Sequence, residues 1–469
     1  MLFNSIDFII YLPIVLVLFY TIPHRYRWMF MLAASYYFYM CWKVEYIALI
    51  IVSTLIDFFA AQQIEKAENV KVKRVFLLIS LVSNLGLLFV FKYFNFATES
   101  LNLAFEQFNI GSQIPAHNLL LPVGISFYTF QTLSYTIDVF YGRQKAEKHL
   151  GHFALYVSYF PQLVAGPIER FSRLSNQLKA HVKLNYKNIA NGLRLILFGF
   201  FIKMVIADNL SAYVDQVYAN TNLYNGADTA LAMVFYSLQI YGDFHGYSSI
   251  AIGTALLFGV NLMDNFKTPY LATSIKEFWE RWHISLSTWF RDYLYIPLGG
   301  NKVRIGKWII NIFIVFAVSG LWHGANWTFV IWGSLYGVIY LLEYLINKTL
   351  KIKPTDSKLG LKRIMLAAKN FVLVTLIWVF FRSQDLEQAK AMFYALGQKN
   401  TTNSLELTPI FSIWLAIFIC LEFLLFNSRF DKWIDRKPLF IRWLFYSILL
   451  FGVLGFAGIQ DYPFIYFQF

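Results

Sequence analysis

Charged residues are scarce in this sequence of 469 residues: Asp, Glu, Lys and Arg make up 14%, whereas apolar residues make up 58% and aromatic residues 19%. A water-soluble domain has about 25% charged and about 45–50% apolar residues. A soluble core of this size could not hide so many apolar side chains from water. Apolar runs near the ~20 residues that a helix needs to cross hydrocarbon recur along the whole chain. The sequence therefore predicts an all-α integral membrane protein.

Cysteine is also rare. Cys41 and Cys420 are the two in the sequence, and each lies in or beside an apolar segment. They form neither a disulfide framework nor a thiolate metal site, so we interpret both as small hydrophobic residues and predict no bound metal. The first seven residues carry no Lys or Arg, and no small-residue cleavage site follows the first apolar run, so we expect a first span there, not a signal peptide.

Several nucleotide-binding and hydrolase motifs are missing. The sequence has no G-x-x-x-x-G-K-[ST], G-x-G-x-x-G, G-x-S-x-G or H-E-x-x-H string, which argues against an ATP-driven pump, a dehydrogenase, a serine hydrolase and a zincin. The net charge of +13 could suggest nucleic acid. However, the positive charges are scattered between apolar segments, where anionic lipid headgroups attract them. We predict the lipid bilayer, and no nucleic acid, as a partner.

The apolar segments predict about twelve transmembrane helices, at 4–22, 28–42, 46–62, 75–92, 118–140, 188–207, 230–258, 308–321, 325–347, 366–381, 408–427 and 441–458. Segment 150–168 is apolar too, but it contains Pro161, Gly166 and Pro167. Non-helical backbone at membrane depth persists only where protein or a water-filled cavity covers it, so we expect this segment to be re-entrant.

The distribution of Lys and Arg predicts the orientation. If the N-terminus is outside, thirty of the forty fall in the cytoplasmic loops 23–27, 63–74, 141–149, 169–187, 272–307, 348–365 and 428–440, and five fall in the outer loops 43–45, 92–117, 208–229, 382–407 and 459–469. This is a strong positive-inside signal and predicts that both termini are extracytoplasmic. With no repeat or linker in the sequence, we expect one membrane domain over 1–469, with a catalytic core at 118–347 and peripheral helices at 1–117 and 348–469.

Two polar interruptions of the apolar pattern are candidate sites. The first is His323, in the string SGLWHGANW at 319–327 inside a long apolar stretch. An ionisable residue at this depth is costly, which favours a functional role over a hydrogen bond between helices. Gly320 and Gly324 are expected to loosen the helix and leave room beside the imidazole.

The second is 276–293, where aromatic residues recur at helical spacing and predict one amphipathic helix at the cytoplasmic interface, aromatic face inward. His283 falls on the shoulder of that face, beside Trp279 and Phe290, where a snorkelling polar group is the simpler interpretation. Segment 295–301 is expected to be a turn that leaves this helix.

Other polar residues carry weaker signals. Asp243 and His245 lie two apart in a predicted span and so on different helix faces, which disfavours a shared metal site. Asp138, and Lys203 with Asp208, are interpreted as ion pairs or helix-end charges. The remaining histidines are expected to be solvated loop residues: His24, His117, His149, His152 and His181.

The longer strings resemble a known family. FWERWHISLSTWFRDY at 278–293 resembles a motif of the membrane-bound O-acyltransferase (MBOAT) family. Its continuation at 294–301 resembles the alginate O-acetyltransferase branch, as do LPVGISFYTFQ at 121–131, YFPQLVAGPI at 159–168 and SGLWHG at 319–324; weaker similarities lie at 378–382 and 463–469. One segment departs: the branch has DFSGYSD where this chain has DFHGYSS at 243–249.

The resemblance implies a ring of tilted helices, with re-entrant and interfacial helices, around a central tunnel. It implies that His323 matches the membrane-embedded catalytic histidine, and His283 the second motif histidine on the cytoplasmic side of the tunnel. We expect further residues to line the tunnel for substrate or donor: Trp282, Ser285, Ser287, Arg291, Asp292, Asn326, Trp322, Gln131 and Asp243.

The implied activity is acyl transfer, most simply of acetyl, in the inner (cytoplasmic) membrane of a bacterium. The donor would be acetyl-CoA or an acyl carrier thioester from the cytoplasm, with no permanently bound cofactor, and the acceptor a hydroxyl of a cell-envelope polysaccharide or of a secreted relay protein. His323 would act as general base, without an acyl-enzyme, while His283 would orient the donor or stabilise the oxyanion. Three alternatives stay open: a D-alanyl transferase with a carrier-protein donor, a lipid or polysaccharide flippase, and a structural scaffold.

Overall fold

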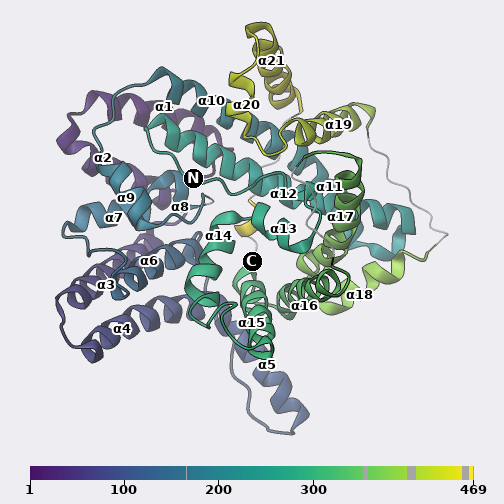
Figure 1. The fold of residues 1–469 in the computed structure, drawn as a ribbon, viewed down its shortest axis with the longest axis horizontal. Helices are drawn as coiled ribbons and strands as arrows, with labels where there is room; N and C mark the ends of the chain where they lie inside the picture. Colours follow the sequence, from purple (N-terminus) through teal and green to yellow (C-terminus); the bar gives the residue numbers. More distant parts are fainter. Residues whose placement is uncertain (165, 352–357, 399–407, 457–463, 468–469) are drawn as a thin grey trace. The chain divides into compact units, whose positions relative to one another are not determined.

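A computed structural model describes residues 1–164, 166–351, 358–398, 408–456 and 464–467, and its regular secondary structure is helical (Figure 1). No β-strand occurs within these ranges, which confirms the all-α prediction. Parts of the predicted loops 348–365 and 382–407, of the last predicted span and of the tail 459–469 lie outside the described residues.

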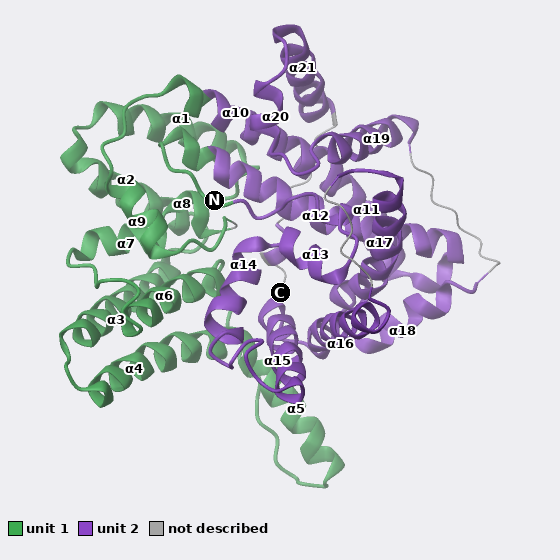
Figure 2. Ribbon diagram, viewed as in Figure 1, with its two compact units in different colours: residues 1–189, 254–263 green, residues 190–253, 264–469 purple. Residues whose placement is uncertain are grey.

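The described chain forms two compact units (Figure 2): unit 1 comprises residues 1–189 and 254–263, and unit 2 comprises residues 190–253 and 264–469. A single membrane domain with a core at 118–347 stays a prediction.

Unit 1 contains nine helices within its described residues: α1 (Ile6–Thr21), α2 (His24–Met40), α3 (Ile47–Lys66), α4 (Val70–Leu88), α5 (Phe94–Gln107), α6 (Ile125–Phe140), α7 (Leu150–Ser158), α8 (Phe160–Leu163) and α9 (Phe171–Lys179). Helices α3, α4 and α6 pack side by side (Figure 1). Between them the buried Asp57 carboxylate accepts hydrogen bonds from Ser80, from Asn84 Nδ2 at 2.8 Å and from Thr136 at 3.3 Å. Such polar contacts hold helices together where lipid offers no hydrophobic drive for their association.

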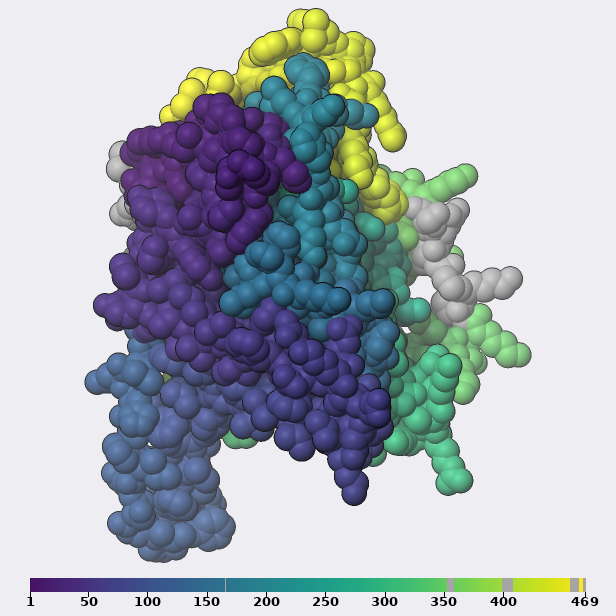
Figure 3. All heavy atoms as spheres, turned by 90° about the vertical axis from the view of Figure 1, so that its left-hand side faces the viewer, coloured from purple at the N-terminus to yellow at the C-terminus, as the bar shows by residue number. Residues whose placement is uncertain are grey.

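The fourth predicted span, 75–92, is much longer in the structure. Helices α4 and α5 are joined by a π-helical turn at Phe89–Tyr93, giving a helical segment of 38 residues at Val70–Gln107. Its length of ~57 Å exceeds the ~30 Å of hydrocarbon. The helix therefore continues into the predicted outer loop 92–117, and which part of it lies outside the membrane stays a prediction. Figure 3 shows the α5 end of this segment (blue) extending beyond the other helices of unit 1.

Segment 150–168 is broken, as its prolines and glycine suggested. α7 ends at Ser158, and Tyr159 has a non-helical ψ of 108° before the single turn of α8. Tyr159 and Phe160 are both 0% exposed, and the Phe160 amide donates to Ser35 Oγ at 3.1 Å. Protein therefore covers this non-helical backbone, which is what re-entrance would require.

Unit 2 contains α10 (Tyr186–Phe200), α11 (Asp208–Ala219), α12 (Gly226–Leu257), α13 (Ile275–Arg281), α14 (Ile284–Phe290), α15 (Ile305–His323), α16 (Trp327–Thr349), α17 (Leu361–Arg382), α18 (Leu386–Ala395), α19 (Pro409–Leu424), α20 (Phe430–Asp435) and α21 (Leu439–Phe456), apart from residues 186–189 and 254–257, which fall in unit 1. A π-helical turn, Phe201–Ala207, joins α10 to α11. The predicted loops 169–187, 208–229 and 382–407 thus contain the helices α9, α11 and α18, and the side of the membrane on which each loop lies stays a prediction. Within the described part of the chain, the contact between α15 and α16 is the most extensive between two helices.

Among the described residues, six helices are long and apolar enough to cross a membrane: Val44–Lys66, Val70–Gln107, Tyr186–Ala219, Ile305–His323, Trp327–Thr349 and Leu361–Arg382. Three shorter apolar helices are α1, α19 and α21. The chain is a multi-pass membrane protein. Twelve crossings and the side of each terminus stay predictions.

Candidate active site

His323 is the last residue of α15, and close contact with α16 fixes this end of the helix. A Cβ atom on Gly320 would lie 2.2 Å from the Phe329 carbonyl oxygen, and one on Gly324 would lie 2.1 Å from the Phe329 ring. The prediction that these glycines leave room beside the imidazole was wrong, and so was the predicted loosening at Gly320, whereas the helix does end directly before Gly324. α15 runs unbroken through Gly320, and the space is occupied by α16.

The His323 imidazole lies in an aromatic cage built from three helices. Its ring centroid is 5.0 Å from Trp322 on α15, 5.0 Å from Trp332 on α16 and 5.4 Å from Phe381 on α17. The residue is 2% exposed. The sequence-based interpretation of a buried imidazole is confirmed, and the surrounding rings keep bulk water away from it.

His283 lies at a break between two short helices. The single amphipathic helix predicted over 276–293 was wrong: α13 ends at Arg281, α14 begins at Ile284, and His283 has a left-handed φ of 43°. Asn265 holds this turn, since its carbonyl oxygen accepts from the Ile284 amide at 3.0 Å and its side chain accepts from Ser285 Oγ at 2.7 Å. After α14 the chain leaves through a π-helical turn, Arg291–Tyr295, and then a turn that begins at residue 296, one residue later than the predicted turn at 295–301.

The break turns His283 inward. The residue is 0% exposed, so its predicted place on the shoulder of an interfacial helix, beside Trp279 and Phe290, was wrong. Its ring meets Phe244 of α12 edge-on at 4.6 Å. Burial lowers the pKa of His283 to about 3, so the imidazole is neutral at cellular pH.

The two imidazoles face each other. Their ring centroids are 6.4 Å apart, and the Tyr466 ring lies 5.6 Å from His323 and 6.3 Å from His283. Residues far apart in the sequence, from α12, the α13–α14 break, α15 and the C-terminal segment, therefore meet at one buried point of unit 2.

A buried ion cluster holds Tyr466 in place. Asp243 accepts from the Ile465 amide at 2.7 Å and pairs with Lys203 Nζ at 2.6 Å, and Lys203 also pairs with Asp208 at 2.5 Å. The predicted Lys203–Asp208 pair is confirmed. Sequence reasoning missed Tyr466: the similarity of 463–469 to the family was its one signal, and nothing in the string locates it beside the histidines.

The other predicted tunnel residues divide into two groups. Four lie next to the histidines: Trp282 and Trp322 are buried, Ser285 bonds Asn265, and Ser287 Oγ donates to the Trp282 carbonyl at 3.2 Å.

The second group has other surroundings. Arg291 and Asp292 form a solvent-exposed ion pair, Asn326 caps α16, and Gln131 belongs to unit 1, where it donates to the Tyr156 carbonyl at 2.6 Å. Asp243 and His245 lie in different surroundings, as predicted, since His245 stacks on Tyr241 at 5.1 Å.

Unit 2 also contains a basic pocket of about 500 Å³, lined by Lys267, Arg429, Lys432 and Arg436 and by the acidic Asp264 and Glu422. Phe266 forms part of its wall. The Phe266 ring is 5.0 Å from Phe244, which contacts His283. A layer of aromatic rings therefore separates this basic pocket from the histidine pair.

Comparison with known proteins identifies the family of this chain. Residues 77–382, which include both histidines, match the membrane-bound O-acyltransferase family. The chain belongs to the membrane-bound O-acyltransferase family. The acyltransferase is 36% identical to a probable alginate O-acetylase of Pseudomonas putida over the full length of both chains. It is 35% identical to a peptidoglycan O-acetyltransferase of Helicobacter pylori, covering 77% of this chain and 72% of the relative.

A more distant relative is a teichoic acid D-alanyltransferase of Bacillus subtilis, 31% identical over 48% of this chain and 59% of its own. Family membership makes the protein an enzyme, so the flippase and scaffold interpretations are wrong.

Proposed function

We propose that this acyltransferase moves an acetyl group from a cytoplasmic thioester to a hydroxyl, with His323 as the general base. The single observation that carries the proposal is the meeting of two buried imidazoles from separate elements, 6.4 Å apart, in a cage of aromatic rings. A purely structural histidine would not need a second one opposite it.

The reaction balances without a covalent enzyme intermediate. His323 takes the hydroxyl proton as the oxygen attacks the thioester carbonyl carbon, the C–S bond breaks, and the leaving thiolate receives that proton. His283 helps to orient the donor or to stabilise the negative oxygen that develops on the carbonyl. The water-poor cage strengthens these interactions, because a low local dielectric screens them less than water does.

The basic pocket is the proposed approach for the donor. Lys267, Lys432 and Arg436 fall in or near segments that the charge distribution predicts to be cytoplasmic, and they would attract a polyanionic thioester such as acetyl-CoA, whereas Arg429 is paired with Asp264 and Asp431. The thioester would then reach His283 past Phe266 and Phe244. An acyl carrier protein presents a phosphopantetheine thioester of similar chemistry and is the alternative donor.

The acceptor is proposed to be a cell-envelope polysaccharide on the far side of a bacterial inner membrane, reached directly or through a secreted relay protein. Support comes from the relatives, whose names specify alginate and peptidoglycan as their acceptors. D-alanyl transfer is the second candidate, and the lower coverage of the D-alanyltransferase favours acetyl.

The test uses the full-length protein in sealed vesicles with radiolabelled acetyl-CoA and an oligosaccharide acceptor. His323→Gln, which keeps a polar side chain of similar size, is expected to lower transfer by about 10²–10⁴-fold. His283→Gln should reduce it less, with a larger effect on KM for the donor if this residue orients the thioester. Full activity in a folded His323→Gln protein would overturn the base assignment.

Sidedness is tested with the same vesicles. Vesicles that expose the predicted cytoplasmic face should react with external acetyl-CoA, and vesicles of the opposite orientation should not. Transfer from D-alanyl carrier protein but not from acetyl-CoA would select the alternative donor.

A further inference from the structure

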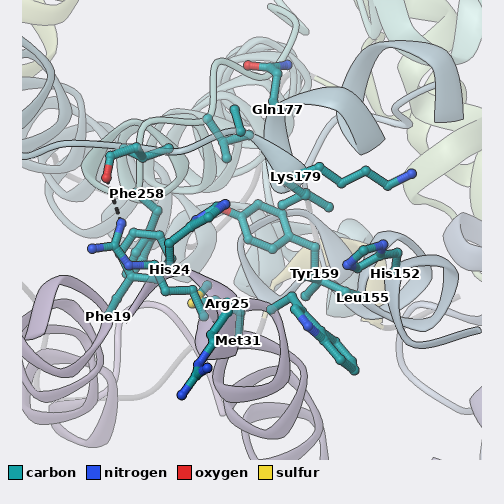
Figure 4. A pocket seen from close by; sticks show the side chains of 16 residues that line it. Phe19, His24, Arg25, Met31, His152, Leu155, Tyr159, Gln177, Lys179 and Phe258 are labelled. Carbon is teal, nitrogen blue, oxygen red and sulfur yellow. Dashed lines mark hydrogen bonds between the residues drawn. The ribbon is translucent and has the colours of Figure 1, made fainter. Parts of the chain in front are cut away.

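Unit 1 contains a pocket of about 320 Å³ that the proposed reaction does not use (Figure 4). It lies where α1 ends and α2 begins, and α7, α9 and residues 258–260 complete it. Five of its side chains are basic or imidazole groups: His24, Arg25, Arg27, His152 and Lys179. None of the described residues that line it is Asp or Glu. The sequence-based expectation that His24 and His152 are solvated loop residues was wrong, because each lies in a helix and lines this pocket.

The positive charge is built into the pocket wall. The Arg27 guanidinium donates hydrogen bonds to three backbone carbonyl oxygens. They belong to Val182 at 2.6 Å, Ile22 at 3.0 Å and Tyr20 at 3.4 Å. These bonds fix the group without neutralising its charge. Lys179 does have a carboxylate partner, Glu147, which lies outside the lining.

Two polar atoms in the wall have no hydrogen-bond partner among the residues that the structure describes. The Tyr159 hydroxyl lacks one although its residue is 0% exposed, and the buried His24 Nδ1 also lacks one. Figure 4 shows the Tyr159 ring in the middle of the pocket, with His24 on one side and Lys179 and His152 on the other. Burying such a group without a hydrogen bond destabilises the protein. A hydrogen-bonding ligand among these side chains would satisfy both atoms.

The rest of the lining is apolar, including Phe19, Met31, Leu155 and Phe258. The pocket also adjoins the end of α1, whose exposed face carries Ile10, Ile14, Val17 and Leu18. A ligand with an anionic head in this pocket could thus extend an apolar part along a face of α1 that suits lipid. The segments 23–27 and 169–187 that frame the pocket are predicted to be cytoplasmic, where anionic phospholipids are abundant.

We propose that this pocket binds the phosphate group of an anionic amphiphile, with a phospholipid headgroup as its source. Arg25, Lys179 and Arg27 provide the charge, and Tyr159 and His24 provide hydrogen bonds. A soluble phosphate compound offers the same head chemistry, and the experiment separates the two sources.

The full-length protein, delipidated in neutral detergent, is titrated calorimetrically with dioctanoyl phosphatidylglycerol, with dioctanoyl phosphatidylcholine and with coenzyme A. Phosphatidylglycerol is expected to bind, and phosphatidylcholine, which has the same chains but no net charge, to bind at least tenfold more weakly. Binding of coenzyme A alone, abolished by the variants below, would support the phosphate site but assign it to a soluble ligand.

The variant R25Q/K179Q should weaken phosphatidylglycerol binding by about tenfold or more, on the basis of two lost cationic contacts. The control K183Q/K187Q removes the same charge from exposed residues outside the lining and should leave binding unchanged. If R25Q/K179Q fails to fold, Tyr159→Phe still tests the site, because it keeps the ring and removes the unpartnered hydroxyl. Equal affinity for both lipids, equal effects of the two double variants, or unchanged binding in Tyr159→Phe would each overturn the proposal.

Discussion

The two histidines reach the same buried point by different means. His323 ends a regular helix, and helix packing across Gly320 determines where it lies. His283 lies in a break with a left-handed backbone, and one asparagine side chain holds that break. The position of His323 therefore depends on how two long helices approach each other, whereas the position of His283 depends on a local turn. Substitutions can therefore disturb the helix contact and the turn separately.

The largest expected effect is on the helix contact. Gly320→Ala places a methyl group 2.2 Å from the Phe329 carbonyl oxygen, so α15 and α16 must move apart and carry His323 with them. We expect a loss of at least 2–3 kcal/mol of stability, typical of overpacking, and of most activity. Gly306→Ala, also in α15 but with open space around it, is the matched control and should melt at or above the wild-type temperature. If both variants melt at the same temperature, helix packing at Gly320 does not determine where His323 lies.

Next is the turn. Asn265→Ala removes the acceptor for Ser285 Oγ and the donor to Ser248 Oγ at 3.2 Å, while leaving both histidines in the sequence. Activity should fall about 10–100-fold, in keeping with the cost of a small misplacement of a reacting group. Steady-state kinetics should show a larger change in donor KM than Gly320→Ala does. Ser287→Ala, which loses one bond beside the same turn, should retain most activity.

A smaller effect concerns the anchor of α13. Glu277 accepts from Arg281 Nε at 2.9 Å and from the buried Arg363 at 2.8 Å. Burial alone would raise the pKa of Glu277, but hydrogen bonds from Thr273 and Arg363 and the charge of Arg281 hold it below its ordinary value. Its stabilisation is therefore present at neutral pH and lost as pH falls below the ordinary range for glutamate.

Glu277→Gln should cost about 1–3 kcal/mol at pH 7, because Arg363 loses its charged partner. Thermal melts at several pH values should show the difference from wild type shrinking in acid. Glu280→Gln, on the same helix but exposed, is the control and should have little effect.

The smallest effect is expected at Arg291 and Asp292. They form an exposed pair at 2.9 Å, and such pairs contribute about 0–1 kcal/mol. Transfer by R291Q/D292N should stay within about twofold of wild type. A large loss would restore these two residues to the donor path that the family resemblance suggested.

The sequence predicted the parts of the site that depend on composition and motif. Scarce charge predicted the helical membrane fold, and an imidazole in an apolar run predicted His323. The break at His283 could not be predicted, because the periodicity within 276–293 fits one continuous helix. The hydrogen bonds that hold the break are accepted by Asn265, which lies outside that segment. Tyr466 was missed for a similar reason, since its position depends on Asp243 and Lys203, more than 200 residues earlier.

The positive φ at His283 has a consequence for any saturation mutagenesis of this enzyme. Each replacement at that position reports on two properties together: the loss of the ring, and the ability of the new residue to adopt a left-handed backbone. Asparagine adopts that backbone more readily than most residues, whereas valine, isoleucine and threonine resist it. An inactive asparagine variant would therefore implicate the imidazole itself, and an inactive valine variant would not.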